Sequence, residues 1–399
     1  MHNVYVGRQP IFDRNLNLAG YELLFRGAQE GAFDLLDAEE ATSQVIVNAF
    51  STIGLDDLVG RQPAFVNVSE RFVLMHPELP LPADRVVLEL LEDTTPGEAL
   101  LTALQEFRKR GFRIALDDFV YAPGVEPLLA LADIVKVEIP RLSDAERAEH
   151  ARLIKRYGAK PLAEKIEDQE TFERCRHAGY ELFQGFFLSR PATVQAGDMP
   201  AARLPLLRLL AVLQDDDADM DELSGLISRD AMLSYRLLRF LNSPATPLRR
   251  RIGTIREAVL YMGLRELRTW ISLLALAAVP NKPEELAVTL IIRARFCELL
   301  CRRLGVSEPG ACFMAGLLSG LDAVLDMPIG QILDRLPISA EVRSAIVDKT
   351  GDAGAVLKAA KAYEEGRFDE VRRLPLEPAS VTECYGTAVK WVEEIRANW

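Results

Sequence analysis

Histidine is scarce in this chain of 399 residues. The sequence has four histidines, and none follows His177. Any mechanism or metal site that needs histidine is therefore excluded from the second half of the chain. Cysteine is also sparse, because the five cysteines form an odd set with no repeated spacing. Disulfide frameworks need paired cysteines and an oxidising compartment, so this set predicts a reducing, cytoplasmic location.

Positive charge and long apolar runs are lacking as well. The formal net charge is -12, which excludes a general electrostatic footprint for nucleic acid. No apolar run approaches the roughly 20 residues of a membrane span, and the start MHNVYVGRQPIF lacks the layout of a signal peptide. Hydrophobic residues make up 49% of the chain, so we expect a soluble globular protein without a nucleic-acid or membrane partner.

Strand and helix patterns alternate over residues 1–192, and this alternation predicts a parallel sheet. The expected strands are 3–7, 18–25, 63–68, 85–90, 112–117, 133–137, 160–164 and 181–184. Polar residues follow nearly every strand, which favours a compact (β/α)8-type barrel, with an irregular first unit as one form of it. An open doubly wound sheet is the alternative.

The second half of the chain changes character. Residues 193–202 read as a linker, and residues 203–399 carry helical spacing in stretches that begin at Leu204, Met220, Ile255 and Glu284. This part predicts an all-α bundle. The expected fold class is α/β plus all-α, with an N-terminal (β/α)8-type barrel followed by a C-terminal helical bundle.

Polar side chains stand where the expected strands of the first half end. Runs such as VVLE, IALDD, IVK and PLAE each close on a carboxylate or an ammonium group. The residues concerned are Glu22, Asn67, Glu89, Asp117, Asp118, Lys136, Glu164 and Gln184. A parallel barrel gathers such strand ends on one rim, where so many carboxylates would repel one another without a divalent cation. The pattern predicts a metal-dependent phosphate-ester site, or the remains of one.

Seven separated motifs of the first half resemble the EAL domain in their order and spacing. They are GYELLFR, FVNVS, LELLE, ALDDF, DIVKVE, AEKIE and FQGFFLSRP, and they cover about residues 3–192. EAL domains are phosphodiesterases that linearise cyclic di-GMP on a barrel. The resemblance therefore implies a barrel that binds this dinucleotide, with Mg2+ or Mn2+ as cofactor if the site is functional.

The resemblance also implies roles for single residues. Metal ligands are implied at Glu22, Asn67, Glu89, Asp117 and Asp118. Catalytic roles around the attacking water are implied for Asp118, Lys136 and Glu164. Contacts with the nucleotide are implied for Gln9, Arg26 and Gln184. Two metal ions would stabilise the attacking and leaving oxygens of the displacement.

The sequence departs from the active pattern in three places. Val120 replaces the glycine after the paired aspartates, where a β-branched residue cannot take the backbone angles that glycine takes freely. Glu138 stands where active enzymes have aspartate, and Lys165 replaces a glycine beside Glu164. Catalysis demands tighter geometry than binding, so we expect activity to be lost before nucleotide binding.

The second half resembles the HDOD domain, a histidine-lacking relative of the HD phosphohydrolases. The motifs are ISRDAMLSYRLLRFLNSP, IREAVLYMGLRELRTWISL and FMAGLLSGLDAVL. The last motif, through Asp322, lies where active HD proteins place a His-Asp pair, and without histidine their metal cage cannot form. The resemblance implies a module that contacts a protein partner.

The two resemblances together indicate an EAL–HDOD protein of bacterial cyclic di-GMP signalling. The leading hypothesis is a barrel that binds, or formerly bound, cyclic di-GMP with weak or no hydrolysis, coupled to an HDOD interaction module. The alternative is an active metal-dependent phosphodiesterase that produces pGpG. Both hypotheses are compatible with a homodimer.

Overall fold

The structure of the protein is a computed structural model, and it describes most of both halves of the chain. The described ranges are 4–27, 54–185 without 80, 92, 93 and 95, 252–263, and 282–396 without 335 and 337, together with 224, 225, 227, 228, 237 and 267. The expected linker 193–202 and the expected helix from Leu204 lie outside them, as does most of the helix from Met220. By contacts within the chain there are two compact units, one of residues 1–190 with 362–386 and one of residues 191–361 with 387–399.

Eight strands in chain order close into a barrel, as the sequence predicts. Their bounds are β1 Val4–Asp13, β2 Leu18–Gly27, β3 Ala64–Val68, β4 Val86–Leu90, β5 Arg113–Leu116, β6 Ile134–Glu138, β7 Lys160–Glu164 and β8 Leu182–Gln184. The pairs from β2 to β8 are parallel, whereas β1 runs antiparallel to both β2 and β8. The barrel is therefore the expected (β/α)8 type with an irregular first unit, and the open sheet is excluded.

A tight turn explains the irregular first unit. The Asp13 carboxylate accepts hydrogen bonds from the backbone N–H groups of Asn15 and Asn17, and Leu16 has a φ of 63°. Such a turn leaves no room for the long crossover that parallel neighbours require. The first two strands consequently form a hairpin, and the parallel pattern begins with β3.

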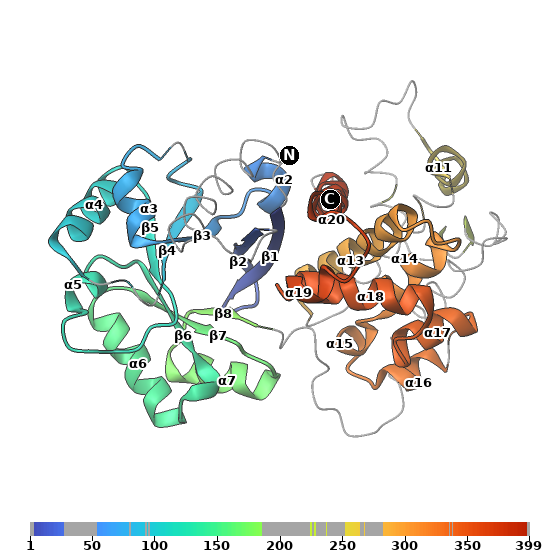
Figure 1. The fold of residues 1–399 in the computed structure, drawn as a ribbon. Helices are drawn as coiled ribbons and strands as arrows, with labels where there is room; N and C mark the ends of the chain where they lie inside the picture. The colour runs from blue at the N-terminus through green and yellow to red at the C-terminus, as the bar shows by residue number, and fades with distance from the viewer. Residues whose placement is uncertain are drawn as a thin grey trace. The chain divides into compact units, whose positions relative to one another are not determined.

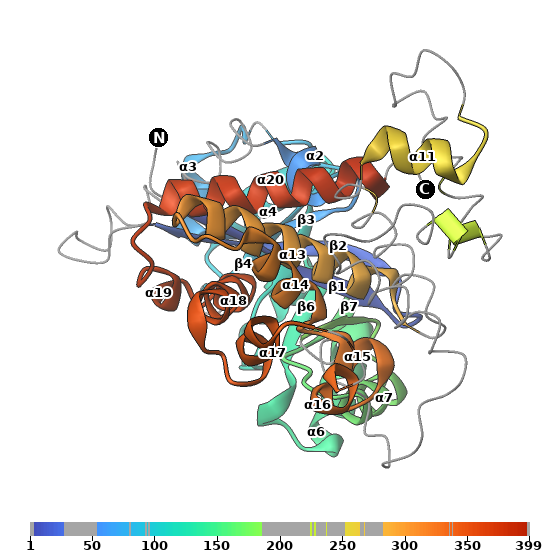
Figure 2. The ribbon, with the colours of Figure 1, turned by 90° about the vertical axis from the view of Figure 1, so that its right-hand side faces the viewer.

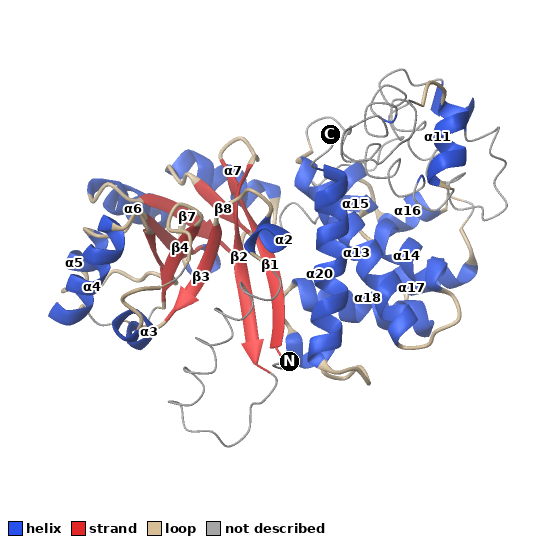
Figure 3. Ribbon diagram, turned by 90° about the horizontal axis from the view of Figure 1, so that it is seen from above, coloured by secondary structure: helices blue, strands red, loops and turns tan. Residues whose placement is uncertain are grey.

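Helices cover the outside of the parallel strands (Figure 1 and Figure 3). They are α2 Leu55–Val59, α3 Glu70–Met75, α4 Glu98–Lys109, α5 Glu126–Leu129, η1 Ile139–Arg141, α6 Asp144–Arg156 and α7 Gln169–Ala178. Helix α4 shows why the chain folds this way, because Leu100, Leu104 and Phe107 recur at helical spacing and are buried. Gly111, with a φ of 98°, turns the chain from this helix into β5.

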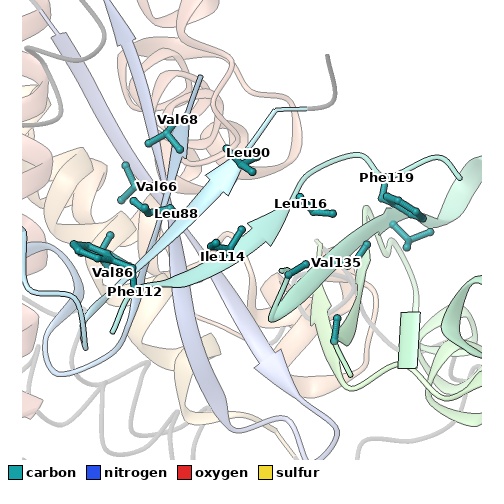
Figure 4. Packing of buried hydrophobic residues seen from close by; sticks show 14 of the residues in the cluster. Val66, Val68, Val86, Leu88, Leu90, Phe112, Ile114, Leu116, Phe119 and Val135 are labelled. Carbon is teal, nitrogen blue, oxygen red and sulfur yellow. The ribbon is translucent and has the colours of Figure 1, made fainter. Parts of the chain in front are cut away.

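The barrel strands alternate between two apolar layers. Side chains such as Val66, Leu88 and Ile114 face outward and form the hydrophobic cluster under the helices (Figure 4). Their neighbours along the strands face inward and form a second cluster that fills the barrel interior. We call this inner cluster the floor; its members are Ile11, Phe65, Val87, Ala115, Ile134, Leu162 and Leu182.

Residues 362–386 belong to the barrel unit and complete one edge of its sheet. Among the described residues, β1 pairs with β8 only over Ile11–Asp13, which leaves the rest of that edge without a strand partner. The Tyr363 hydroxyl accepts a hydrogen bond from the Val6 N–H and donates one to the Val6 carbonyl. Tyr5 stacks on Phe368 with ring centroids 5.1 Å apart.

The second half is helical wherever the structure describes regular elements in it, in agreement with the sequence. The helices are α11 Ile255–Met262, α13 Glu284–Arg303, α14 Pro309–Leu318, α15 Leu321–Leu325, α16 Ile329–Leu333, α17 Ala340–Val347, α18 Gly351–Glu364, α19 Phe368–Val371 and α20 Pro378–Arg396. Helix α13 packs along α14, which also contacts α17 (Figure 2). Gly316 makes the first contact close, since a Cβ there would lie 2.6 Å from the Cα of Ala294. Within the described residues no helix is long and apolar enough to cross a membrane.

Candidate functional site

The polar residues predicted from the sequence lie one step above the floor of the barrel. Side chains two residues apart on a strand point to the same face, so each residue that follows a floor residue by two positions also points inward. The steps are Phe65 to Asn67, Val87 to Glu89, Ala115 to Asp117, Ile134 to Lys136, Leu162 to Glu164 and Leu182 to Gln184. Strand alternation therefore places six predicted site residues in one layer at the C-terminal end of the barrel.

Lys136 lies at the centre of this layer, and its side chain is 1% exposed. Its Nζ is 2.9 Å from Glu164 Oε1, 3.0 Å from Asp117 Oδ1 and 3.3 Å from Glu22 Oε2. A fourth ion pair joins it to Glu89, which is fully buried. One ammonium group thus contacts four carboxylates from four different strands or strand ends.

Amide side chains link the carboxylates on the β1–β3 side. The Gln184 amide donates to Glu22 Oε2 at 2.5 Å and to Gln9 Oε1 at 2.9 Å. The Asn67 amide donates to the other Glu22 oxygen at 3.2 Å. The structure therefore brings Gln9, Gln184 and Asn67 into the same site as Glu22, as the sequence predicts for neighbours on one rim.

Several oxygens of the site have no hydrogen-bond partner although they are buried. They are Asn67 Oδ1, Glu89 Oε2, Glu164 Oε2 and Gln184 Oε1. All are acceptors, and buried acceptors without partners are costly. A hard divalent cation takes oxygen ligands of this kind, so the donor set fits Mg2+ or Mn2+.

Burial and crowding shift the protonation of the buried acids. Burial raises the pKa of Glu89 well above its ordinary value despite the attraction of Lys136. The pKa of Glu164 is raised to about 7, chiefly by burial; Lys136 opposes the shift, and Asp117 and Glu22 add to it. Burial alone would lower the pKa of Lys136, but the surrounding carboxylates, Glu89 first, raise it well above the usual range. These acids hold protons more readily than exposed acids do.

Asp118 adds a second group of carboxylates at the outer side of the layer. Oxygens of Asp117, Asp118 and Glu164 lie within 4.8 Å of one another, a spacing that could hold a metal ion. Asp118 adopts a φ of 39°, and hydrogen bonds from the Asp117 N–H to Leu90 and from the Phe119 N–H to Lys136 hold the turn on both sides. Burial, and then Asp117, raise the pKa of Asp118.

Lys165 and Glu138 form an ion pair beside Asp118. Lys165 Nζ lies 3.1 Å from Glu138 Oε1 and 4.0 Å from Asp118 Oδ1. The sequence singles out both residues as departures from the active pattern but does not pair them. The strand step places Ile134, Lys136 and Glu138 on one face of β6, but the pair also depends on the register that sets Glu138 opposite Glu164 of β7.

Val120 behaves differently from the expectation. Its φ is not positive, so the position does not use the backbone freedom of a glycine, and the positive φ of this turn lies at Asp118. The valine side chain is 74% exposed. It borders a groove of about 820 Å³ that extends from Asp118 and Glu138 along helix α6 to Arg156.

Arg26 is the one predicted site residue whose side chain lies outside the described part of the structure. Its backbone belongs to β2, opposite Tyr5 of β1. In the helical half, the segment that resembles the His-Asp position of HD proteins carries Ser319 and Asp322. The Arg293 guanidinium donates to the Ser319 hydroxyl at 3.0 Å, and the Lys361 ammonium donates to the Ser319 carbonyl at 3.2 Å.

Two family models match the chain in succession. The model of the EAL domain matches residues 67–191, and the model of the HDOD domain matches residues 199–325. The order of the two domains is the one that the sequence motifs predict.

Two curated proteins are similar to the chain over nearly its whole length. One is the cyclic di-GMP phosphodiesterase CdgJ of Vibrio cholerae serotype O1, 32% identical over 94% of this chain and 88% of that protein. The other is the uncharacterized protein YuxH of Bacillus subtilis, 30% identical over 98% of each chain.

Solved structures resemble the chain more weakly. Klebsiella pneumoniae BlrP1, in a complex with calcium and cyclic di-GMP, matches with a TM-score of 0.41 and 22% identity over 48% of this chain and 56% of that chain. The Bacillus subtilis YkuI protein, which has an EAL domain and was solved with cyclic di-GMP and calcium, matches with a TM-score of 0.40 and 18% identity over 58% of this chain and 72% of that chain.

Proposed function

Because the chain belongs to the EAL–HDOD family of two-domain proteins, we propose that its barrel binds cyclic di-GMP together with a divalent cation and hydrolyses it weakly or not at all. Membership of this family supports a role of the protein in cyclic di-GMP signalling. The binding of a divalent cation and the dinucleotide is supported by the layer of carboxylates around Lys136, which has buried oxygens without a hydrogen-bond partner.

The residues of this layer are suited to hold Mg2+ or Mn2+. Glu22, Asn67, Glu89 and Asp117 would supply oxygens for one ion. Asp117 and Asp118, with Glu164, would supply oxygens for another. When bound, such an ion supplies positive charge to phosphate oxygens and lowers the pKa of a coordinated water.

The other residues of the site would bind and orient the dinucleotide. Gln9 and Gln184 share a hydrogen bond, and their amides would contact the dinucleotide. Arg26 would contact a phosphate through its planar fork of donors. Lys136 would hold the surrounding carboxylates in place, since its ammonium contacts all four of them at once.

Weak hydrolysis follows from the demands of the reaction on geometry. An attacking water must be held very close to its productive position, whereas binding of the ligand tolerates looser placement. Here Lys165 stands beside Asp118, and the loop after Asp118 carries Val120 in place of glycine. Lys165 borders the position where Asp117, Asp118 and Glu164 converge, and Val120 follows Asp118 by two residues in the chain.

Full phosphodiesterase activity, with pGpG as product, is the second candidate function. One specific observation favours it, because each carboxylate that the sequence assigns to the metals is retained and lies in the layer or beside it. Lys136 would then help to orient the water. The two candidate functions both predict binding of cyclic di-GMP and differ only in whether the protein hydrolyses it at an appreciable rate.

The helical half would pass the state of the barrel to a protein partner. The proposed division places the EAL domain at residues 1–192, the linker at 193–202 and the HDOD domain at 203–399. A homodimer and a cytoplasmic location stay predictions of the sequence.

The test measures binding and turnover on the same preparation of the full chain. Calorimetry with Mn2+, then with cyclic di-GMP in the presence of Mn2+, gives both affinities, and chromatography of the reaction gives pGpG. We expect binding with little product. Rapid conversion to pGpG would favour the enzyme, and absence of binding with either ligand would contradict the proposal.

A matched pair of variants shows whether the site is correctly placed. Glu22→Gln keeps the shape of the side chain but removes a carboxylate that contacts Lys136. It should abolish or strongly weaken Mn2+ binding. Glu106→Gln, on helix α4 with a 62% exposed side chain, makes the same chemical change outside the site and should leave binding unchanged. Equal Mn2+ affinity in both variants would mean that the metal binds elsewhere.

A further inference from the structure

Lys165 brings a positive charge to the edge of an otherwise acidic group. Its ammonium pairs with Glu138 at 3.1 Å and lies 4.0 Å from Asp118 Oδ1. Asp118 in turn shares the position where its oxygen, one of Asp117 and one of Glu164 lie within 4.8 Å of one another. Lys165 therefore borders a candidate cation position at Asp118, while Lys136 contacts the other two acids of that position, Asp117 and Glu164.

The backbone holds Lys165 in this place. Its φ is 55°, an angle that residues with a Cβ seldom adopt. The next residue, Ile166, donates its N–H to the Gln184 carbonyl at 3.1 Å, and Gly185 lies so close that a Cβ there would meet Ile166 O at 2.3 Å. The turn is thus fixed against β8, and the Glu138 carboxylate directs the lysine side chain toward Asp118.

A fixed charge of this kind acts on metal binding by repulsion. A monovalent and a divalent cation a few ångströms apart repel one another even when water screens them. This repulsion lowers the affinity for the divalent ion by about tenfold. The Lys165 side chain is 54% exposed, so the screened value is the appropriate one. The ion held by Glu22, Asn67 and Glu89 would be affected less, since Lys165 pairs with Glu138 and Asp118 and not with these residues.

We propose that Lys165 is a tethered cation that partly replaces the second divalent ion, neutralising Asp118 and weakening metal binding at Asp117, Asp118 and Glu164. This inference rests on the proposed function. It assigns a specificity role to Lys165, because the site would then bind its dinucleotide with one tightly held divalent cation and one protein ammonium group.

Calorimetry of the full chain with Mn2+ alone tests the proposal. The relevant binding step is identified as the one that Asp118→Asn removes. Lys165→Gln deletes the charge at nearly constant shape, and this step should tighten about tenfold. Lys165→Gly should tighten it by a similar factor, whereas Lys165→Arg, which keeps the charge, should resemble the unmodified protein.

The matched control is Lys160→Gln. Lys160 is an exposed lysine at the opposite end of the same strand, β7, so its loss changes the net charge equally without reaching the site. The proposal is supported if only Lys165→Gln and Lys165→Gly tighten the step. It is overturned if Lys165→Gln leaves the affinity unchanged, or if only Lys165→Gly tightens it, since backbone relief would then be the cause.

The proposed function can fail separately. If the unmodified chain and every Lys165 variant give no heat with Mn2+, both the metal site and the inference are overturned. If the unmodified chain binds Mn2+ and Glu22→Gln loses that binding, but the Lys165 variants do not differ, the function stands and the tethered cation is refuted.

Discussion

Replacement of Lys136 by methionine is the most informative single perturbation of the barrel. Methionine keeps the length and most of the volume of the side chain but deletes the ammonium that contacts Glu22, Glu89, Asp117 and Glu164. Removing one partner of a buried ion pair costs about 3–5 kcal/mol, because the remaining charge stays buried without compensation. We expect Lys136→Met to lower the free energy of unfolding by at least about 3 kcal/mol at pH 8 without divalent metal.

The assay must measure the unfolding of the barrel separately from that of the helical half. The three tryptophans of the chain, Trp270, Trp391 and Trp399, all lie in the second half, so their fluorescence reports on that part. Urea unfolding followed by far-ultraviolet circular dichroism, with hydrogen exchange of peptides from β3 to β7, gives the barrel signal. Lys136→Met should shift this signal and leave the tryptophan transition nearly unchanged.

Two further variants make the reasoning refutable. Lys155→Met removes a half-exposed lysine that pairs with Glu181 at 3.1 Å, and pairs of this kind contribute only about 0–1 kcal/mol. Glu89→Gln combined with Lys136→Met should recover about 1–3 kcal/mol of the loss, because the two residues are in direct contact. A loss below about 1 kcal/mol for Lys136→Met, equal to that of Lys155→Met, would refute Lys136 as the main counter-ion of the layer.

Three other predictions follow from the described contacts. Since the pKa of Glu164 is raised to about 7 in the folded state from its ordinary 4.5, the folded state holds this proton more tightly, and the free energy of unfolding of the metal-free protein should fall as pH rises from 4.5 to about 7. Urea unfolding at several pH values checks this, and Glu164→Gln should flatten the slope. Gly185→Ala should lower the yield or the thermal midpoint of the folded barrel sharply, measured by calorimetric melting, because its Cβ would lie 2.3 Å from the Ile166 carbonyl oxygen. Tyr363→Phe should cost about 1–3 kcal/mol in urea unfolding, because both backbone groups of Val6 lose a buried partner, and a variant as stable as the original would contradict this contact.

Strand alternation explains why so much of the site could be predicted from the sequence. The runs VVLE, IALDD, IVK and PLAE each carry a polar residue two positions after an apolar one, and this spacing gives a shared inner face once the strands are parallel. The closed barrel and the convergence of Asn67, Glu89, Lys136 and Glu164 are confirmed on this basis, and Glu22 joins them through its contacts with Lys136 and Asn67.

Other features depend on contacts between distant segments and were beyond the sequence. The pairing of Lys165 with Glu138 requires the register of β6 against β7, which no local pattern specifies. The positive φ of this turn lies at Asp118 and not at Val120, and the neighbours of Asp118 are held by hydrogen bonds to β4 and β6. The contact of Tyr363 with Val6 joins residues 357 positions apart.

The floor beneath the site constrains how this protein can vary. If a strand gained or lost one residue, the side chains that now point into the barrel would point outward. A carboxylate or ammonium group of the site would then lie among the apolar side chains under the helices, and so would the floor residue of that strand. Folding and ligand binding would then fail together, since the same alternation serves both. Length changes are consequently tolerable only between the strands, and the loops that carry Val120 and Lys165 lie there. Changes in the site that leave the barrel intact are therefore expected at loop residues such as Lys165, beside the inward-facing strand positions.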